Sequence, residues 1–149
     1  MKISAKARYG LRIMLDISVN GRTGPRTIKD IAGSQDISLK FISRLVVELR
    51  NAGFIKSVRG TRGGLKLARA PQRITLLDIV EAMDGPVSLL ECLGDHETCP
   101  RYPECVAKDI WGEIDEGFKA LLASFTLQTI IERHAARNAT SMAFPACYI

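Results

Sequence analysis

Apolar side chains recur every three or four positions in three stretches of the first third of the chain, which predicts three helices. The first is expected over 5–19 and ends at the turn-forming run 20–25. Thr27, followed three residues later by an aspartate, has the pattern of a capping box and begins a second, short helix. Ser38 caps a third helix that ends at Gly53. The inner side of this third helix carries Phe41, Ile42, Leu45, Val46 and Leu49. Two short helices joined by a turn have the form of a helix-turn-helix motif.

Two stretches in which apolar and polar residues alternate, 54–58 and 65–68, follow the third helix and predict a β-hairpin. Its connection, 59–64, is rich in glycine and contains Arg59 and Arg62. Glycine permits close approach to another surface, and guanidinium groups suit phosphates or a narrow minor groove. Such a turn taken alone is most simply a solvated hairpin. Directly after a helix-turn-helix it predicts a wing that contacts DNA.

The second half of the chain is also expected to be helical. Thr75 and Asp78 repeat the capping pattern and begin a helix that ends near Met83. After a cysteine-containing loop, apolar residues recur at spacings of three and four from Val106 to Phe125, and a shorter helix is expected over 126–136. The apolar face of the long helix is wider than one small domain covers, as in a helix-to-helix dimer seam. Periodicity alone equally fits an ordinary core helix.

These patterns predict a fold that is mainly α with a small β-hairpin: a winged helix-turn-helix followed by a long dimerisation helix. The expected organisation is a DNA-binding domain over 1–73, a cysteine loop with dimerisation helices over 74–137, and a tail over 138–149. The tail is predicted because that stretch lacks caps and regular apolar spacing. With 46% hydrophobic residues, the rest of the chain is expected to form a packed core.

Charge divides the chain at the same place as the pattern does. Residues 1–73 contain 16 Lys and Arg against 4 Asp and Glu, whereas residues 74–149 contain 5 against 12. A positive charge concentrated in this way indicates a surface that binds a polyanion such as double-stranded DNA. No export signal or membrane-spanning run is evident, so a cytoplasmic protein without membrane contact is expected.

Three cysteines, Cys92, Cys99 and Cys105, lie in one short acidic stretch that also contains two prolines. Thiolates bind soft metals and react with oxidants, so this grouping indicates a metal site or a redox switch. Six residues separate the first two cysteines and five separate the last two, unlike the paired two-residue gaps common in zinc sites. An iron-sulfur cluster is therefore favoured. A cluster-free switch based on cysteine oxidation and a structural zinc remain as alternatives.

Several ordered motifs together resemble the IscR/NsrR family of winged-helix transcriptional regulators. They are Lys2-Ile3-Ser4, Arg8-Tyr9-Gly10-Leu11, Ile37-Ser38-Leu39, Leu49-Arg50-x-Ala52-Gly53, Val58-Arg59-Gly60-x-x-Gly63-Gly64 and the three cysteines. The resemblance implies a homodimer on two-fold symmetric promoter DNA, with the third helix in the major groove and the wing tip in the adjacent minor groove. It also implies an iron-sulfur cluster on the three cysteines, expected as [2Fe-2S] with [4Fe-4S] as the alternative.

The resemblance assigns individual positions of the DNA-binding surface. Ser38 and Lys40 match the start of the family's recognition helix, Ser43 a position that faces the groove, and Arg59 the wing arginine; Arg62 is added from its charge alone. Members that regulate cluster biogenesis have a glutamate at the position of Ser43, which takes part in selecting the DNA sequence. Their target site is therefore not expected to be shared.

The fourth ligand of the implied cluster is left open by the sequence. Cluster-biogenesis regulators use a histidine three residues after the last cysteine, where this chain has Lys108, and nitric-oxide sensors use an acidic residue near the start, where it has Arg8. The remaining candidates are His96, Asp109, a carboxylate of the other subunit or a small exogenous molecule.

An enzyme is not expected, because no histidine has an identifiable acidic partner and no phosphate-binding motif of the Walker type occurs. A protein-interaction module would leave the basic first half unexplained.

Overall fold

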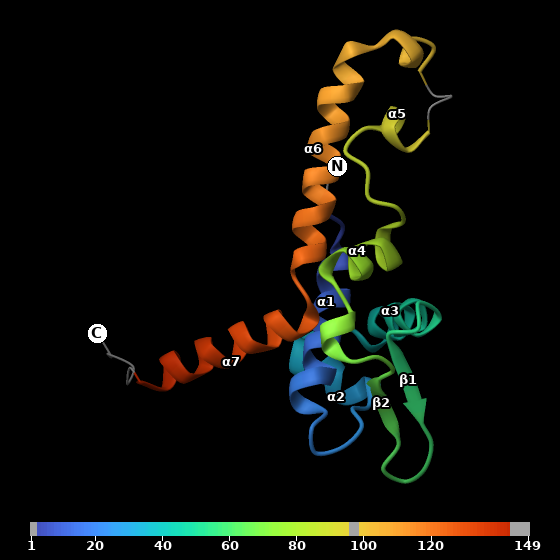
Figure 1. The fold of residues 1–149 in the computed structure, drawn as a ribbon. Helices are drawn as coiled ribbons and strands as arrows, with labels where there is room; N and C mark the ends of the chain where they lie inside the picture. Colours follow the sequence, from blue (N-terminus) through green and yellow to red (C-terminus); the bar gives the residue numbers. More distant parts are fainter. Residues whose placement is uncertain (1–2, 96–98, 144–149) are drawn as a thin grey trace, which may run out of the picture.

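The computed structural model describes residues 3–95 and 99–143, and it places a helix-turn-helix and a hairpin before a long, partly detached helical region (Figure 1). The first part consists of α1 (Ala5–Asn20), α2 (Ile28–Gln35), α3 (Leu39–Asn51), β1 (Ile55–Val58) and β2 (Gly64–Leu67). The second part consists of the 3-10 turn η1 (Pro71–Arg73), α4 (Leu76–Asp84), α5 (Glu91–Gly94), the 3-10 turn η3 (Tyr102–Glu104), α6 (Val106–Ser124) and α7 (Leu127–Ala143). The predicted fold class is confirmed.

Short-range capping explains where the helices of the first part begin. The side chains of Ser4, Thr27 and Ser38 each accept a hydrogen bond from the backbone N–H three residues later, at the start of α1, α2 and α3. Thr75 does the same for α4, and both threonine caps are complete capping boxes because the aspartate three residues on accepts from the threonine N–H. These helix starts are thus encoded locally.

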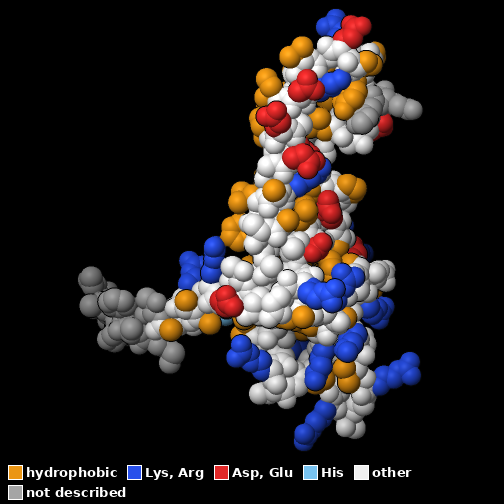
Figure 2. All heavy atoms as spheres, in the orientation of Figure 1, with side chains coloured by type: hydrophobic (Ala, Val, Ile, Leu, Met, Phe, Trp, Pro, Cys, Tyr) orange, Lys and Arg blue, Asp and Glu red, His pale blue; other side chains and the backbone are white. Residues whose placement is uncertain are grey.

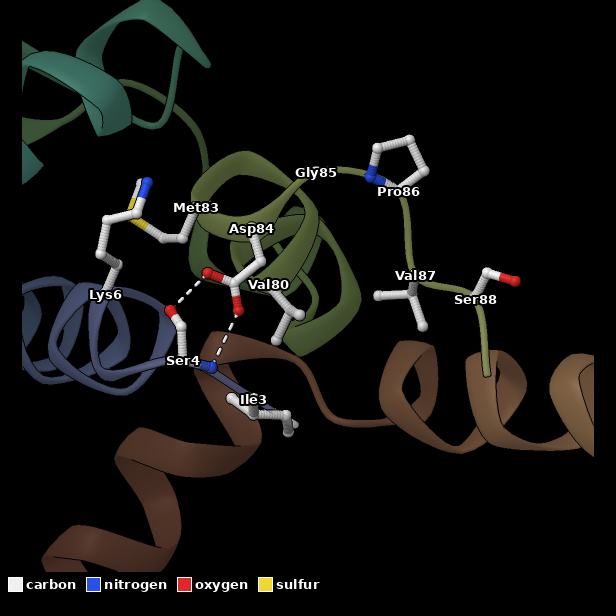
Figure 3. Close-up of a pocket in the computed structure, with 10 residues that line it drawn as sticks. All are labelled: Ile3, Ser4, Lys6, Val80, Met83, Asp84, Gly85, Pro86, Val87 and Ser88. Carbon is white, nitrogen blue, oxygen red and sulfur yellow. Dashed lines mark hydrogen bonds between the residues drawn. The ribbon is translucent and has the colours of Figure 1, made fainter. Parts of the chain in front are cut away.

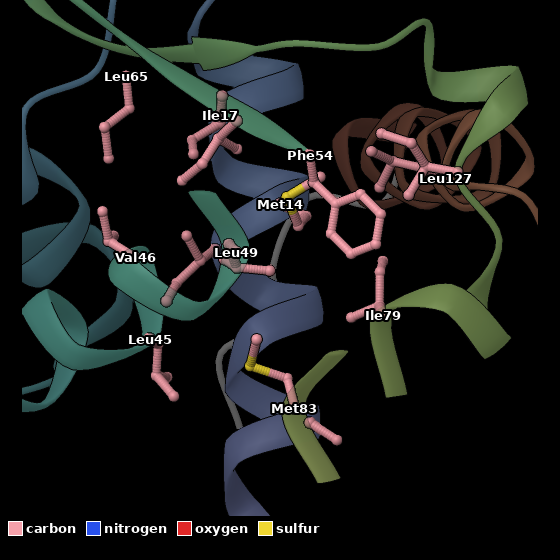
Figure 4. Close-up of a cluster of buried hydrophobic side chains, with 14 of the residues drawn as sticks. Met14, Ile17, Leu45, Val46, Leu49, Phe54, Leu65, Ile79, Met83 and Leu127 are labelled. Atoms are coloured by element: carbon pink, nitrogen blue, oxygen red, sulfur yellow. The ribbon is translucent and has the colours of Figure 1, made fainter. Parts of the chain in front are cut away.

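The hydrophobic core lies where α1 crosses α3 and α4, beneath the hairpin (Figure 4). Its largest fully buried side chains are Ile13, Met14, Ile31, Ile42, Leu45, Leu49, Ile55, Ile74, Ile79 and Leu127. A side chain at Gly10 would place its Cβ 3.0 Å from Cγ of Met83, so glycine lets α1 and α4 approach each other closely. The wing and both helices of the helix-turn-helix therefore share one core.

The corner between α6 and α7 is fixed to that same core. The N–H of Leu76 donates to the carbonyl of Phe125 at 2.8 Å, and the N–H of Leu127 donates to the carbonyl of Ile74 at 2.8 Å. Leu127 itself is fully buried. From this corner α6 extends away from the winged helix toward the stretch from Cys92 to Cys105, here called the cysteine segment, while the wing lies at the opposite end of the molecule (Figure 1).

One predicted boundary is wrong. The last helix is expected to end at 136, but α7 continues to Ala143. The added residues include two alanines and neither glycine nor proline, and the first residue that interrupts a helix, Pro145, comes later. A helix can continue without a strongly apolar face where neither glycine nor proline interrupts it. The division into 1–73, 74–137 and 138–149 stays a prediction.

Candidate DNA interface and cysteine segment

The helix-turn-helix presents the outer side of α3 to solvent. Asp36 takes the left-handed conformation (φ 53°) at the end of α2, which turns the chain sharply toward α3. Ser38, at the N-cap of α3, uses its hydroxyl oxygen to accept from the N–H of Phe41 at 3.3 Å. Lys40 is exposed on the first turn, and the hydroxyl of Ser43, one turn later, donates to the carbonyl of Leu39 at 2.7 Å. The three predicted residues of this helix therefore lie at its N-terminal end.

Two basic residues of α1 hold this motif in place. The guanidinium of Arg12 donates to both the side-chain and the backbone oxygen of Gln35, each at 2.9 Å, at the end of α2. Lys6 forms an ion pair with Glu48 of α3 at 3.3 Å. Both cations are thus engaged within the protein, and their structural task is to orient the helix-turn-helix against α1.

The hairpin forms the predicted wing. Strands β1 and β2 pair antiparallel with Val58 opposite Gly64, and the N–H of Gly63 closes the turn by donating to the carbonyl of Gly60 at 2.9 Å. Gly60 has φ 116°, a conformation that side chains disfavour. Arg59 and Arg62 are both exposed at this tip. The structure therefore brings the two predicted arginines together at one end of the molecule.

Sequence reasoning missed a second basic pair on the wing. The register places Lys56 directly opposite Lys66, and both are exposed. Like charges directly across a strand pair destabilise a hairpin, so the pair favours a nearby polyanion that offsets the repulsion. The signal was present in the alternation of both strands, but only the register makes the two lysines neighbours. Most Lys and Arg visible in Figure 2 gather around the winged helix, whereas Asp and Glu gather along α6 and the cysteine segment.

A buried carboxylate ties the wing to the helix-turn-helix. Asp16 of α1 is buried and accepts hydrogen bonds from Arg26 at 2.9 Å, from Gln35 at 3.0 Å and from the hydroxyl of Ser34. Burial acts to raise the pKa of Asp16, but these hydrogen bonds and the guanidinium charge bring its pKa below the usual value. The backbone of Arg26 in turn pairs with Leu65 of the wing through bonds of 3.0 and 2.8 Å. Asp16 thus connects the helix-turn-helix to the chain that pairs with the wing.

The three predicted metal ligands occupy three different local settings. Cys92 lies in α5, Cys99 begins the turn before η3, and Cys105 is the N-cap of α6; all three are free thiols and half-buried. Among the residues that the structure describes, no group of three His, Cys, Asp or Glu side chains is close enough to hold a metal ion. His96 lies outside those residues, and Asp109 is exposed in the first turn of α6.

The donor chemistry of this segment nevertheless fits an iron-sulfur cluster, because three uncommitted thiols are the ligands that such clusters use. Lys108, three residues after the last of these cysteines, has a structural task. The ammonium of Lys108 donates to the carbonyl of Pro103 at 3.0 Å and lies 4.9 Å from the centre of the Tyr102 ring. Lys108 therefore fixes the turn that leads to Cys105 and is itself no ligand when protonated.

The chain that leads to Cys92 is attached to α6 by a second buried carboxylate. Asp115 accepts from the N–H of Leu89 at 2.6 Å and forms an ion pair with Lys119 at 2.7 Å. Burial acts to raise the pKa of Asp115, but the bonds from Lys119 and Leu89 lower its pKa below the usual value. Both ends of the cysteine segment are therefore connected to the same helix.

The outer side of α6 is apolar and uncovered within the single chain. Its exposed large side chains are Val106, Ile110, Trp111, Ile114 and Leu121, with Val106 78% and Ile110 61% exposed. A contiguous exposed apolar stripe of this kind marks an interaction surface. Gly117 lies within the stripe, and a Cβ there would meet nothing within 4 Å, so this part of α6 permits close helix-to-helix approach.

A cavity of about 380 Å³ opens between the start of α1 and the end of α4 (Figure 3). The carboxylate of Asp84 accepts from the N–H of Ser4 at 3.0 Å and from its hydroxyl, and Lys6, also on the wall, pairs with Glu48. Its two charged groups are thus used to join elements of the fold. Their arrangement resembles no acid-base or nucleophilic site.

The matching family model, "Iron-dependent Transcriptional regulator", spans residues 3–133. The chain belongs to the Rrf2 family. As a member of this family it is a transcriptional regulator and not an enzyme.

Individual Rrf2-family proteins resemble the chain over nearly its whole length. CymR of Bacillus subtilis is 39% identical over 130 residues, which are 87% of this chain and 89% of CymR. The structure of that protein, the global cysteine regulator of B. subtilis, superposes with a TM-score of 0.75 at 36% identity and covers 89% of this chain and 98% of its own. T. potens IscR gives 0.70 at 29% identity over 99% and 95% of the two chains. The oxidized form of Staphylococcus aureus CymR gives 0.69 at 32% identity over 89% and 97%.

These likenesses confirm the predicted resemblance and the winged-helix fold of this Rrf2-family member. No helix in the described ranges is long and apolar enough to cross a membrane.

Proposed function

We propose that this Rrf2-family regulator binds promoter DNA as a homodimer through α3 and the wing, and that an iron-sulfur cluster on Cys92, Cys99 and Cys105 controls the binding. The observation that carries the proposal is that a basic surface and a group of three thiols lie at opposite ends of one molecule. The basic winged helix lies at one end, the three free thiols lie at the other, and α6 connects them (Figures 1 and 2).

The DNA-binding part rests on the charge and geometry of α3 and the wing. Lys40 is exposed on α3, and Arg59 and Arg62 are exposed at the wing tip. A helix in the major groove with a basic loop beside it can reach bases and phosphates together. The opposed lysines of the hairpin, Lys56 and Lys66, add charge that a phosphate backbone would neutralise.

Replacing Arg59 with alanine is expected to weaken binding to duplex DNA by about tenfold and to lower the salt dependence of binding. The slope of log affinity against log salt should become shallower by about two, one for each wing of a dimer. Each phosphate contact that is lost reduces by about one the number of counterions released when the protein binds. Fluorescence anisotropy across a salt series measures both. Arg137→Ala, which removes an exposed arginine of α7, is the matched control and should bind as the wild type does. Unchanged affinity and slope for Arg59→Ala would refute the wing assignment.

The homodimer rests on the apolar stripe of α6. Two copies related by a two-fold axis would each cover the other's stripe, and a symmetric interface of this kind is the commonest oligomer contact. Asp109, Glu113 and Glu116 flank the stripe on one side of the helix and are exposed. A polar rim around an apolar centre is typical of protein interfaces.

The sensing part rests on the three thiols and on how they are attached to α6. When bound, an iron-sulfur cluster supplies a centre that exchanges electrons and is sensitive to oxidants. Cys105 begins α6, and Asp115 holds the chain before Cys92 against the same helix. A change in the conformation of the cysteine segment would therefore act on α6 at two points, Cys105 and Asp115. Such a change would shift the population of arrangements that a dimer adopts on DNA.

Protein prepared without oxygen and supplied with iron and sulfide is expected to show cysteine-dependent visible absorption. Cys105→Ala should abolish this absorption, because three thiolates cannot be replaced by two without loss of the cluster. Cys147→Ala, which removes the cysteine outside the described residues, is the matched control and should retain it. Colourless wild-type protein with no bound iron or sulfide would refute the cluster. It would not bear on the proposal that α3 and the wing bind DNA.

A second candidate mechanism is a cluster-free switch in which two of the thiols form a disulfide. It is favoured by the observation that all three thiols are free and half-buried, and that the resembling S. aureus CymR occurs in an oxidized form. In this reaction two thiols would lose two protons and two electrons to a peroxide, which becomes two waters. Mass spectrometry of metal-free protein after peroxide treatment detects the disulfide, and DNA affinity before and after treatment shows whether it regulates binding.

A further inference from the structure

The outer side of α3 carries a row of small and apolar side chains. Leu39, Ser43 and Val47 follow one another at intervals of four residues, which places them along one side of the helix. Leu39 is 52% and Val47 44% exposed. Lys40 and Arg44, both exposed, lie beside this row. The DNA-facing helix thus combines cations with apolar groups that the protein itself leaves uncovered.

This row has little capacity to form hydrogen bonds with bases. Leu39 and Val47 have no polar atoms, and the hydroxyl proton of Ser43 is already donated to the carbonyl of Leu39 at 2.7 Å. Ser43 can therefore only accept. The bidentate recognition of guanine or adenine requires arginine, lysine, asparagine or glutamine, and none of these types occurs within the row. Selection of bases along this row must come from shape and apolar contact.

The major groove offers one apolar feature, the C5-methyl group of thymine. Bringing it against Leu39 and Val47 removes apolar surface from water on both partners. Lys40 and Arg44, four residues apart and therefore both along the same edge of the row, suit the phosphates that border one side of the groove. We infer that α3 selects half-sites with thymines whose methyl groups contact Leu39 and Val47; the inference rests on the proposed DNA binding and specifies which DNA is bound.

The length of the row limits where these thymines lie. Val47 lies eight positions after Leu39, which corresponds to about 12 Å along a helix. Base pairs follow one another at about 3.4 Å. The selected thymines should therefore fall within about four base pairs of one another in each half-site, and a two-fold axis repeats the pattern in the second half-site.

The test begins with selection of binding sites from a random-sequence duplex pool by the full chain. The selected 30-base-pair duplex is then resynthesised with deoxyuridine at one thymidine at a time, which removes a single methyl group and leaves base pairing unchanged. We expect enriched thymines in each half-site and about a fourfold loss of affinity for each contacted methyl.

The assignment to individual side chains uses two variants in the same assay. Val47→Ala should lose the discrimination between thymidine and deoxyuridine at one position per half-site and keep it at the position that Leu39 contacts. Arg44→Ala should weaken binding to both duplexes by the same factor. Both side chains are exposed, so neither change disturbs the core.

The outcomes distinguish failure of the methyl contacts from failure of the proposed DNA binding. Tight binding to selected duplexes in which no deoxyuridine substitution alters affinity, or in which the half-sites contain no thymine, refutes the methyl contacts and leaves DNA binding established. Failure to enrich any duplex from the pool refutes both.

Discussion

Ile110→Glu combined with Ile114→Glu is expected to convert the proposed dimer into monomers and to weaken promoter binding by about a hundredfold or more. Both isoleucines are exposed in the middle of the α6 stripe. In a symmetric dimer four carboxylates would meet in an apolar interface, where each unpaired charge is costly to bury. A monomer engages a single half-site and loses the gain that comes from binding two linked half-sites together.

Light scattering after size exclusion gives the oligomeric state, and anisotropy with two-half-site and one-half-site duplexes gives the affinities. The monomeric variant should bind both duplexes equally well. Ala120→Glu is the control for added negative charge, because it places one carboxylate on the same helix beside Glu113 and Glu116, outside the stripe, and should leave the dimer intact. A double variant that remains dimeric would show that α6 is not the dimer seam.

Asp16→Asn is expected to lower the free energy of unfolding by about 3 kcal/mol, because it leaves Arg26 without its counter-charge in a largely buried site. It also places an amide donor against two other donors, Ser34 and Gln35. Since the same carboxylate anchors α2 and the loop that pairs with the wing, DNA affinity should fall as well. Urea denaturation followed by circular dichroism measures the stability.

The pH dependence of stability gives an independent check on Asp16. Its pKa in the folded protein is lowered, so its contribution is fully present above the unfolded value of about 3.9 and is lost as pH falls through the folded value. Asp16→Asn should therefore lose less stability than the wild type below about pH 4, while the part due to Asp115 remains. Asp36→Asn, which makes the same change at an exposed residue whose conformation suits asparagine, should leave stability within about 0.5 kcal/mol. An equal loss in the two variants would refute the role of Asp16.

The parts of the fold that the sequence predicted are those whose signals are local. Three helix starts are predicted from a hydroxyl residue and the residues just after it, at Thr27, Ser38 and Thr75. The structure shows all three caps. The glycines and arginines of the wing likewise lie within one turn. The predicted end of the last helix is too early because no glycine or proline occurs between 137 and 143, and apolar spacing is a poor guide at 137–139, where the side chains are exposed.

The parts that could not be predicted depend on pairs that are distant in sequence. Asp16 reads as an ordinary polar position of an amphipathic helix, and only the folded chain brings Arg26, Ser34 and Gln35 to it. One partner of Asp115 is the backbone N–H of Leu89, 26 residues earlier, and a contact over that separation cannot be inferred from composition or periodicity. The ligand roles of the three cysteines, and the DNA contacts of Ser38, Lys40, Ser43, Arg59 and Arg62, remain predictions that the experiments above address.

The fixed corner between α6 and α7 has a consequence for how a signal would reach the DNA. Because the corner is hydrogen-bonded to the residues that begin α4, α6 cannot pivot without carrying its winged helix along. With 19 residues, α6 is about 28 Å long. If α6 tilts by about 5° about its end at the cysteine segment, the other end, at the corner with α7, moves by about 2.5 Å. In a dimer the two displacements would add, and the distance between the recognition helices would change by more than one base-pair step. On the proposed mechanism, the cysteine segment would set the distance between the two recognition helices, and so the half-site spacing that the dimer prefers.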